Sequence, residues 1–123
     1  MNITKSGSDA FQATLSVEEV RVIHQALNEV CNGLPVTLFG KAPRDITAIK
    51  SEMEKLSNIY DEAKSQHDNL RVQVDLSSAQ LRLYRSVLRE VWSQIEDWEF
   101  ETRMGVPKQM LHSLVDSLQS IVE

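Results

Sequence analysis

Two stretches of this chain decide its fold because they share one pattern: LSVEEVRVIHQALNEV at residues 15–30 and LSSAQLRLYRSVLREV at residues 76–91. The stretches stand 61 residues apart, and identical residues recur at that offset: Arg21 and Arg82, Leu27 and Leu88, Glu29 and Glu90, and Val30 and Val91. Other paired positions differ only in apolar shape, such as Val20 and Leu81. The pattern indicates an internal duplication.

The residues before each stretch predict a strand that leads into a helix. Apolar and polar residues alternate in FQATLS at 11–16 and in VQVDLS at 72–77, and a period of two is typical of a half-buried strand. Ser16 is followed three residues later by Glu19, and Ser77 by Gln80. Because this spacing is that of a capping box, we predict helices that begin within a couple of residues of each serine.

Apolar residues after each cap recur at spacings of three and four, which places them on one stripe of a helix. Gly33 and Pro35 are expected to end the first helix near residue 33, whereas the second has no breaker and is expected to run to about Trp98. Pro43 and Pro107 suit the first turn of two further helices, because a proline there loses no hydrogen bond.

These elements predict a mainly α (α+β) protein with one domain over residues 1–123. Each repeat, 10–64 and 71–123, is a strand-helix-helix unit too small to bury its own apolar face. We expect the two strands to pair as a short antiparallel ribbon, with four helices around it and a pseudo-two-fold axis between the repeats. Residues 1–8 are expected to be disordered. Without the strands, the same helices would form a four-helix bundle.

The composition limits which kinds of partner are expected for this chain. Thirteen basic and eighteen acidic residues give a formal charge of −5, which argues against nucleic acid and favours a basic protein. No apolar run approaches the roughly 18 residues that a bilayer span needs, so no membrane association is expected. The single cysteine, Cys31, favours a reducing, cytoplasmic compartment. A homodimer is left open.

LSVEEVRVIHQALNEV together with EFETRMGV, residues 99–106, resembles a group of small uncharacterised bacterial proteins with the pattern LSxxE[LV]…LNEV…EFxTRxG. The resemblance covers about a fifth of the chain and implies no activity. The first repeat departs from it, because VTLFGKAP at 36–43 has only Phe39 and Gly40 in common with the second. Any surface made by EFETR is therefore expected once.

Groups capable of catalysis or metal binding are sparse. His24, His67 and His112 lie on different predicted elements, and none has a second histidine at helical spacing. Neither a zinc-binding spacing nor a glycine-rich phosphate loop occurs, so no cofactor, metal or catalytic residue is predicted. Cys31 aligns with Trp92 of the second repeat, which favours packing over nucleophilic chemistry for the thiol.

Glu29 and Glu90 are the residues of an alternative functional hypothesis, in which the two side chains form a ligand site. They occupy the same position in the two repeats, and would face each other if the pseudo-two-fold axis passed between the first helices. Two converging carboxylates raise one pKa or hold a cation. This hypothesis predicts a small ligand-binding or cation-binding protein, or an enzyme, with a pocket between them. In the plainer alternative, each glutamate pairs with an arginine from elsewhere or stays solvated.

The preferred hypothesis rests on residues 90–101, which hold five acids, no base and both tryptophans. Aromatic anchors supply affinity and exposed charges supply steering in protein interfaces. The sequence thus favours a non-catalytic module that binds or sequesters a basic protein, as an immunity-type inhibitor does. The plainer alternative places Trp92 in the core and Trp98 at a helix end. The predicted partner-binding residues are Glu96, Asp97, Trp98, Glu99 and Glu101.

Overall fold

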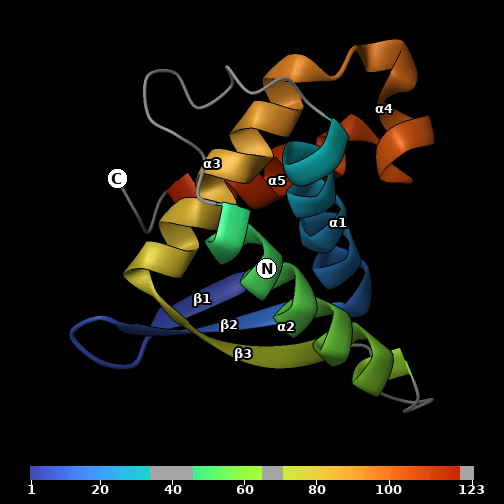
Figure 1. Ribbon diagram of the computed structural model, residues 1–123. Helices are drawn as coiled ribbons and strands as arrows, with labels where there is room; N and C mark the ends of the chain where they lie inside the picture. The colour runs from blue at the N-terminus through green and yellow to red at the C-terminus, as the bar shows by residue number, and fades with distance from the viewer. Residues whose placement is uncertain (34–45, 65–70, 120–123) are drawn as a thin grey trace.

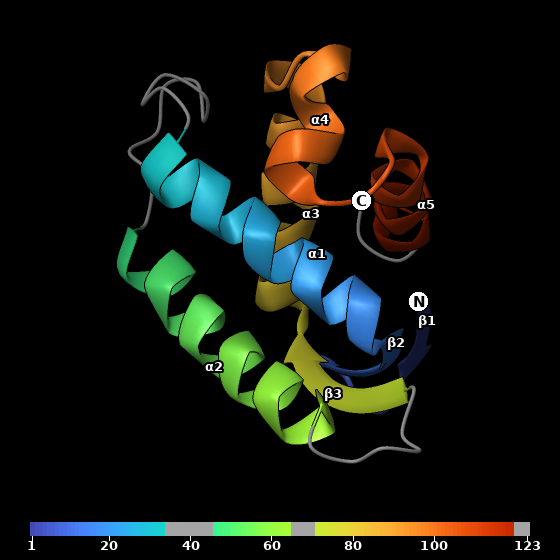
Figure 2. The ribbon, with the colours of Figure 1, turned by 90° about the vertical axis from the view of Figure 1, so that its right-hand side faces the viewer.

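The structure, a computed structural model, describes residues 1–33, 46–64 and 71–119. These residues form a small antiparallel sheet with the helices gathered on one side of it (Figure 1). The view turned by 90° shows α1, Val17–Asn28, side by side with α2, Ile46–Lys64 (Figure 2). The same view shows α5, Lys108–Gln119, on the opposite side of α3, Ser78–Gln94. The described part of the chain is therefore mainly helical, with a short sheet, as predicted. None of its helices is long and apolar enough to cross a bilayer.

The sheet contains three strands in the order β1-β2-β3: Asn2–Lys5, Ala10–Ser16 and Arg71–Ser77. The two predicted strands are confirmed as β2 and β3, which pair antiparallel with Ala13 opposite Val74. Alternate side chains of β3 are buried, among them Val74 and Leu76, while Gln73 and Asp75 are exposed. This alternation follows from the pleat, which turns successive side chains to opposite faces.

The N-terminal residues differ from the prediction. Asn2–Lys5 are not disordered but form β1, which pairs antiparallel with β2. The expected two-stranded ribbon is therefore wrong, and the sheet has three strands. β1 was missed because NITK has no apolar alternation of its own; the open edge of β2 supplies its hydrogen-bond partners.

Both predicted capping boxes are present. Ser16 Oγ accepts from Glu19 N at 3.0 Å, and Ser77 Oγ accepts from Gln80 N at 3.2 Å. The N3 side chains bond back to the serine N–H groups at 2.8 Å in each case. These caps begin α1, Val17–Asn28, and α3, Ser78–Gln94. They fix where each strand ends and each helix begins.

The two capping boxes differ in the additional partner of their N3 side chain, which is Glu19 in one and Gln80 in the other. Glu19 accepts from the Met1 ammonium at 2.6 Å, whereas the Gln80 amide donates to Glu52 of α2 at 2.9 Å. Burial would raise the pKa of Glu19, but its hydrogen bonds from Met1 and Ser16 outweigh burial and lower it. The same local motif therefore fastens different elements in the two units.

Five α-helices and one π-helical turn are described, rather than the four helices expected. η1, Glu29–Gly33, continues α1. α2 spans Ile46–Lys64, and α5 spans Lys108–Gln119 after Pro107. The predicted helix start at Pro43 and the polar hinge at 65–69 lie outside the described residues.

The helix predicted to run to Trp98 is interrupted. α3 ends at Gln94, because Ile95 and Glu96 adopt extended backbone, and α4, Asp97–Met104, starts in a new direction. Ile95 is buried at this corner. The break has no glycine or proline to announce it, so the sequence pattern could not predict it.

The core lies between the sheet and the helices and includes residues from every helix and from both long strands. Tyr84 and Phe100 are its largest side chains. The Tyr84 hydroxyl donates to Glu52, a buried carboxylate that the Gln80 amide also contacts. Burial and this hydrogen bond raise the pKa of Tyr84, so the phenol stays neutral and serves as a donor in the core.

Candidate functional site

The acidic segment at 90–101 is divided by the α3–α4 corner into two separate surfaces. Glu90 and Trp92 belong to α3 and line a groove against α5. The residues from Glu96 to Glu101 form or precede α4. The predicted partner-binding residues therefore stay together on α4, whereas Glu90 and Trp92 are part of another site.

The outer side of α4 presents Trp98. Its indole is 80% exposed, the highest value among the large hydrophobic residues that the structure describes. Glu101 and Thr102, three and four residues further along, are also exposed and share this helix face. We call Glu96, Trp98 and Glu101 the α4 face.

Two of the predicted acids are engaged within the chain. Asp97 pairs with Lys108 at 2.6 Å, and Glu99 lies 3.9 Å from Arg103. Glu96 and Glu101 are exposed, and neither forms an ion pair with another residue in the described ranges. Of the five predicted partner-binding residues, Glu96, Trp98 and Glu101 are thus exposed and form no ion pair within the described ranges.

The inner side of α4 fixes the helix to the core. Phe100 and Met104, one turn apart, are buried. Arg103 forms an ion pair with Glu29 at the start of η1. Trp98 therefore projects from a helix that apolar packing and a cross-helix ion pair both hold in place.

The C-terminal end of α4 is fastened by Arg21 of α1. Its guanidinium donates to the Met104 carbonyl at 3.4 Å and to the Gly105 carbonyl at 3.3 Å, two acceptors at the helix end. Gly105 has φ +75°, and a Cβ there would lie 2.8 Å from Arg21 Nη1. Glycine therefore permits both the left-handed cap and the close approach of Arg21.

Glu29 has a structural explanation. This glutamate is 9% exposed, receives a hydrogen bond from Gln25 at 3.1 Å and pairs with Arg103. Glu29 belongs to LNEV at 27–30 and Arg103 to EFETR at 99–103, so these two segments contact each other. The ion pair therefore fastens α4 to η1.

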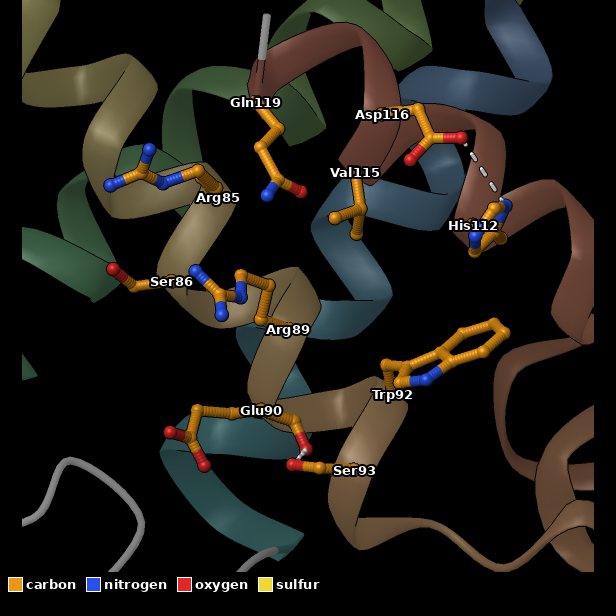
Figure 3. Close-up of a pocket in the computed structure, with 10 residues that line it drawn as sticks. All are labelled: Arg85, Ser86, Arg89, Glu90, Trp92, Ser93, His112, Val115, Asp116 and Gln119. Atoms are coloured by element: carbon orange, nitrogen blue, oxygen red, sulfur yellow. Dashed lines mark hydrogen bonds and ion pairs between the residues drawn. The ribbon is translucent and has the colours of Figure 1, made fainter. Parts of the chain in front are cut away.

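Trp92 is held against α5. Its exposed fraction is 37%, its ring lies 5.3 Å from that of His112 at a tilt of 47°, and the Lys108 ammonium lies 4.6 Å from its ring centroid. Figure 3 shows Trp92 beside His112, at one side of the groove between α3 and α5. The alternative that places Trp92 in the core is wrong, since the indole is exposed and forms a wall of this groove.

The groove has a volume of about 700 Å³ and takes six lining residues from α3 and four from α5 (Figure 3). Glu90 is one of them, whereas Glu29 is not. Sequence reasoning missed the groove because its α5 residues, among them His112 and Asp116, are distant in sequence from α3. The sequence offers one local signal, since Arg85 and Arg89 are spaced by one helical turn, but that spacing is equally typical of an ordinary solvated face.

The other histidine on a described helix, His24, lines a small cavity of about 200 Å³ between α1 and α2, together with Arg21, Ser57 and Tyr60. Burial lowers the pKa of His24, and the nearby Asp61 charge opposes that effect only in part. Within the described ranges, no three His, Cys, Asp or Glu side chains are grouped so as to hold a metal ion.

A scan against protein-family models, a search of curated proteins and a search of solved structures each found no match to this chain.

Proposed function

We propose that this chain is a non-catalytic interaction module whose α4 face binds a basic protein. The observation that carries the proposal is Trp98, an 80% exposed indole on a helix whose opposite side is anchored in the core. Exposing an indole to water is unfavourable, and tryptophan is enriched among the residues that dominate binding energy. A protein partner that covers Trp98 would remove this cost.

The docking of α4 supports the proposal. Phe100, Met104, the Arg103–Glu29 pair and the Arg21 contacts hold the helix before any partner arrives. A preorganised anchor loses little conformational freedom on binding. Binding then carries little entropic cost for ordering α4.

The charges define the partner. Glu96 and Glu101 flank the indole without ion pairs to described residues, and the whole chain carries a formal charge of −5. Exposed carboxylates of this kind accelerate association with a cationic surface and orient the encounter. An immunity-type inhibitor that sequesters a basic protein would use these features.

The test is capture of partners from the native host by the immobilised chain, followed by binding kinetics with the purified partner. We expect a basic protein that dissociates more readily at high salt. Trp98→Ala should weaken its binding by about 30-fold, mainly through faster dissociation. Glu96→Lys with Glu101→Lys should slow association and reduce its salt dependence.

The matched control is Glu54→Lys with Asp61→Lys, which makes the same change in charge at exposed positions of α2. Equal loss of binding in both double variants would show that only net charge matters. Unchanged binding by Trp98→Ala would exclude the α4 face.

The alternative function, a small ligand-binding protein or enzyme with a pocket between Glu29 and Glu90, is favoured less. Glu29 is compensated by Arg103, and only Glu90 lines the α3–α5 groove. Any small-ligand site is better placed in that groove than between the two glutamates.

We also propose that the two strand-helix units arose by duplication of one ancestral strand-helix-helix unit and are related to each other by a pseudo-two-fold axis. The β2–β3 register supports this: Ala13 pairs with Val74, and these two residues occupy equivalent positions of the repeats. The equivalent serines cap α1 and α3.

We further propose a bacterial origin, on the basis of the sequence resemblance, and a cytoplasmic location, on the basis of the single cysteine.

A further inference from the structure

The α3–α5 groove has a cationic side that the α4 proposal does not use. Arg85 and Arg89, one helical turn apart, line it, and their guanidinium groups lie on the same side of α3 (Figure 3). Arg89 is exposed and forms no ion pair with any residue that the structure describes. A guanidinium offers a planar set of donors that matches the two oxygens of a carboxylate.

The other side of the groove is aromatic and apolar. Trp92 and His112 lie with ring centroids 5.3 Å apart, and Val115 lines the groove beside them. Part of the Trp92 ring remains open, since the residue is 37% exposed. A flat ring placed here would exchange water for contact with the indole.

The spacing of the two sides sets the size of a ligand. Arg89 and Trp92 are three residues apart on α3, so their Cβ atoms lie about 5–6 Å from each other on one helix face. A single molecule of one or two fused rings can therefore reach the guanidinium with its acid group while its ring contacts the indole. The volume of about 700 Å³ falls within the range of small-molecule sites.

The carboxylates in the groove are already engaged. Asp116 lies 3.4 Å from His112 Nδ1. Glu90 also has an interaction within the molecule. Arg85 has an interaction of its own as well. Of the four charged side chains from α3 and α5 in the groove, Arg89 is therefore the one that is exposed and forms no ion pair with a described residue.

We propose that the α3–α5 groove binds a small aromatic carboxylate, with the carboxylate on Arg89 and the ring against Trp92. This site is independent of the α4 face, which lies beyond the α3–α4 corner. Binding of the acid requires no metal and no covalent step.

The test is an NMR titration of the ¹⁵N-labelled chain with 2-naphthoate, followed at the two indole N–H signals. The Trp92 signal should shift and saturate in the millimolar range or below, while the Trp98 signal serves as an internal control and stays in place. 2-Naphthamide, which has the same ring without the charge, should bind about tenfold more weakly because it lacks the charge-assisted hydrogen bonds.

Arg89→Ala should weaken 2-naphthoate binding by about tenfold, whereas Arg82→Ala, an exposed arginine of α3 outside the groove lining, should change it less than about twofold. Because Arg89 is exposed, the variant should keep the wild-type spectrum away from the groove. Absence of a Trp92 shift, equal affinity for acid and amide, or an unchanged affinity in Arg89→Ala would each overturn the proposal. Equal shifts of both indoles would overturn it as well, because they would indicate non-specific contact.

Discussion

Trp92 and Trp98 lie six residues apart in one acidic segment, yet their surroundings differ. Trp92 contacts His112 and lies beneath the Lys108 ammonium, which also pairs with Asp97. Trp98 is 80% exposed, and the structure describes no ring or cation contact to it. The chain therefore supplies a cation and an aromatic neighbour for Trp92, whereas Trp98 is left exposed.

The difference arises at the α3–α4 corner. Trp92 is on α3 and faces α5, whereas Trp98 is on α4 and points away from Phe100 and Met104 of the same helix. The corner at Ile95 and Glu96 ends α3 and starts α4 as a separate helix. The contrast between the two indoles depends on α4 being firmly docked.

The largest effect is expected from removing the apolar anchor of α4. Phe100→Ala should lower the free energy of unfolding by about 3–5 kcal/mol, because it leaves a cavity at a residue that is 1% exposed. Trp98→Ala, which removes an aromatic ring from the outer side of the same helix, should change it by less than about 0.5 kcal/mol. Urea denaturation measures both, and similar losses in the two variants would contradict the assigned orientation of α4.

The ion pair between Arg103 and Glu29 should contribute less than Phe100 to the free energy of unfolding. Arg103→Ala leaves the 9% exposed Glu29 without its cation and should cost about 2 kcal/mol. In a double-mutant cycle with Glu29→Gln, the two substitutions should show a coupling energy of about 1–2 kcal/mol. Additive costs would mean that the pair does not hold α4 in solution.

The turn after α4 gives a smaller effect. Gly105→Ala should cost about 1–2 kcal/mol because alanine disfavours a φ of +75°. Its Cβ also meets Arg21, so the cost should decrease when Gly105→Ala is made in an Arg21→Ala chain. A neutral substitution in thermal or urea unfolding would argue against the left-handed cap.

The smallest effect concerns the cation over Trp92. Lys108→Met removes the contact to the indole and the exposed pair with Asp97, and should cost about 0.5–1 kcal/mol. Acrylamide quenching of Trp92 should increase, while that of Trp98 should not. Lys50→Met on α2, an exposed lysine of another helix, is the control and should alter neither indole.

Local patterns predicted the ends of elements well. Ser16 and Ser77, each followed by a glutamate or glutamine at the third position, cap α1 and α3, and the alternations before them form β2 and β3. These features are determined within a few residues of sequence. They were predictable because capping and alternation act over that distance.

Features that depend on tertiary contacts were not predictable. β1 is a polar segment that becomes a strand only because β2 offers an open edge. The corner at Ile95 places Phe100 in the core and needs no sequence breaker. The Glu29–Arg103 pair joins residues 74 positions apart, so only the folded chain shows that this glutamate is compensated.

The functional sites also depend on tertiary contacts, so the sequence predicted them only in part. The acids and indoles of residues 90–101 identified a region of interest, but not its division between α4 and the α3–α5 groove. The ion pairs of Asp97 with Lys108 and of Glu99 with Arg103 could not be predicted from the acidic segment alone. Arg89 has no local signal that distinguishes it from a solvated arginine, because His112 and the other α5 residues of the groove are distant in sequence.

The most direct measurement is acrylamide quenching of the two single-tryptophan variants, Trp92→Phe and Trp98→Phe, free and bound to the captured partner. In the free protein, Trp98 should be quenched more strongly than Trp92. Addition of the partner should lower the quenching constant of Trp98 at least about twofold and leave that of Trp92 unchanged, because a binding anchor is desolvated in the complex. A Trp98 that is shielded in the free chain, or that stays equally accessible in the complex, would contradict the assignment of the α4 face as the binding surface.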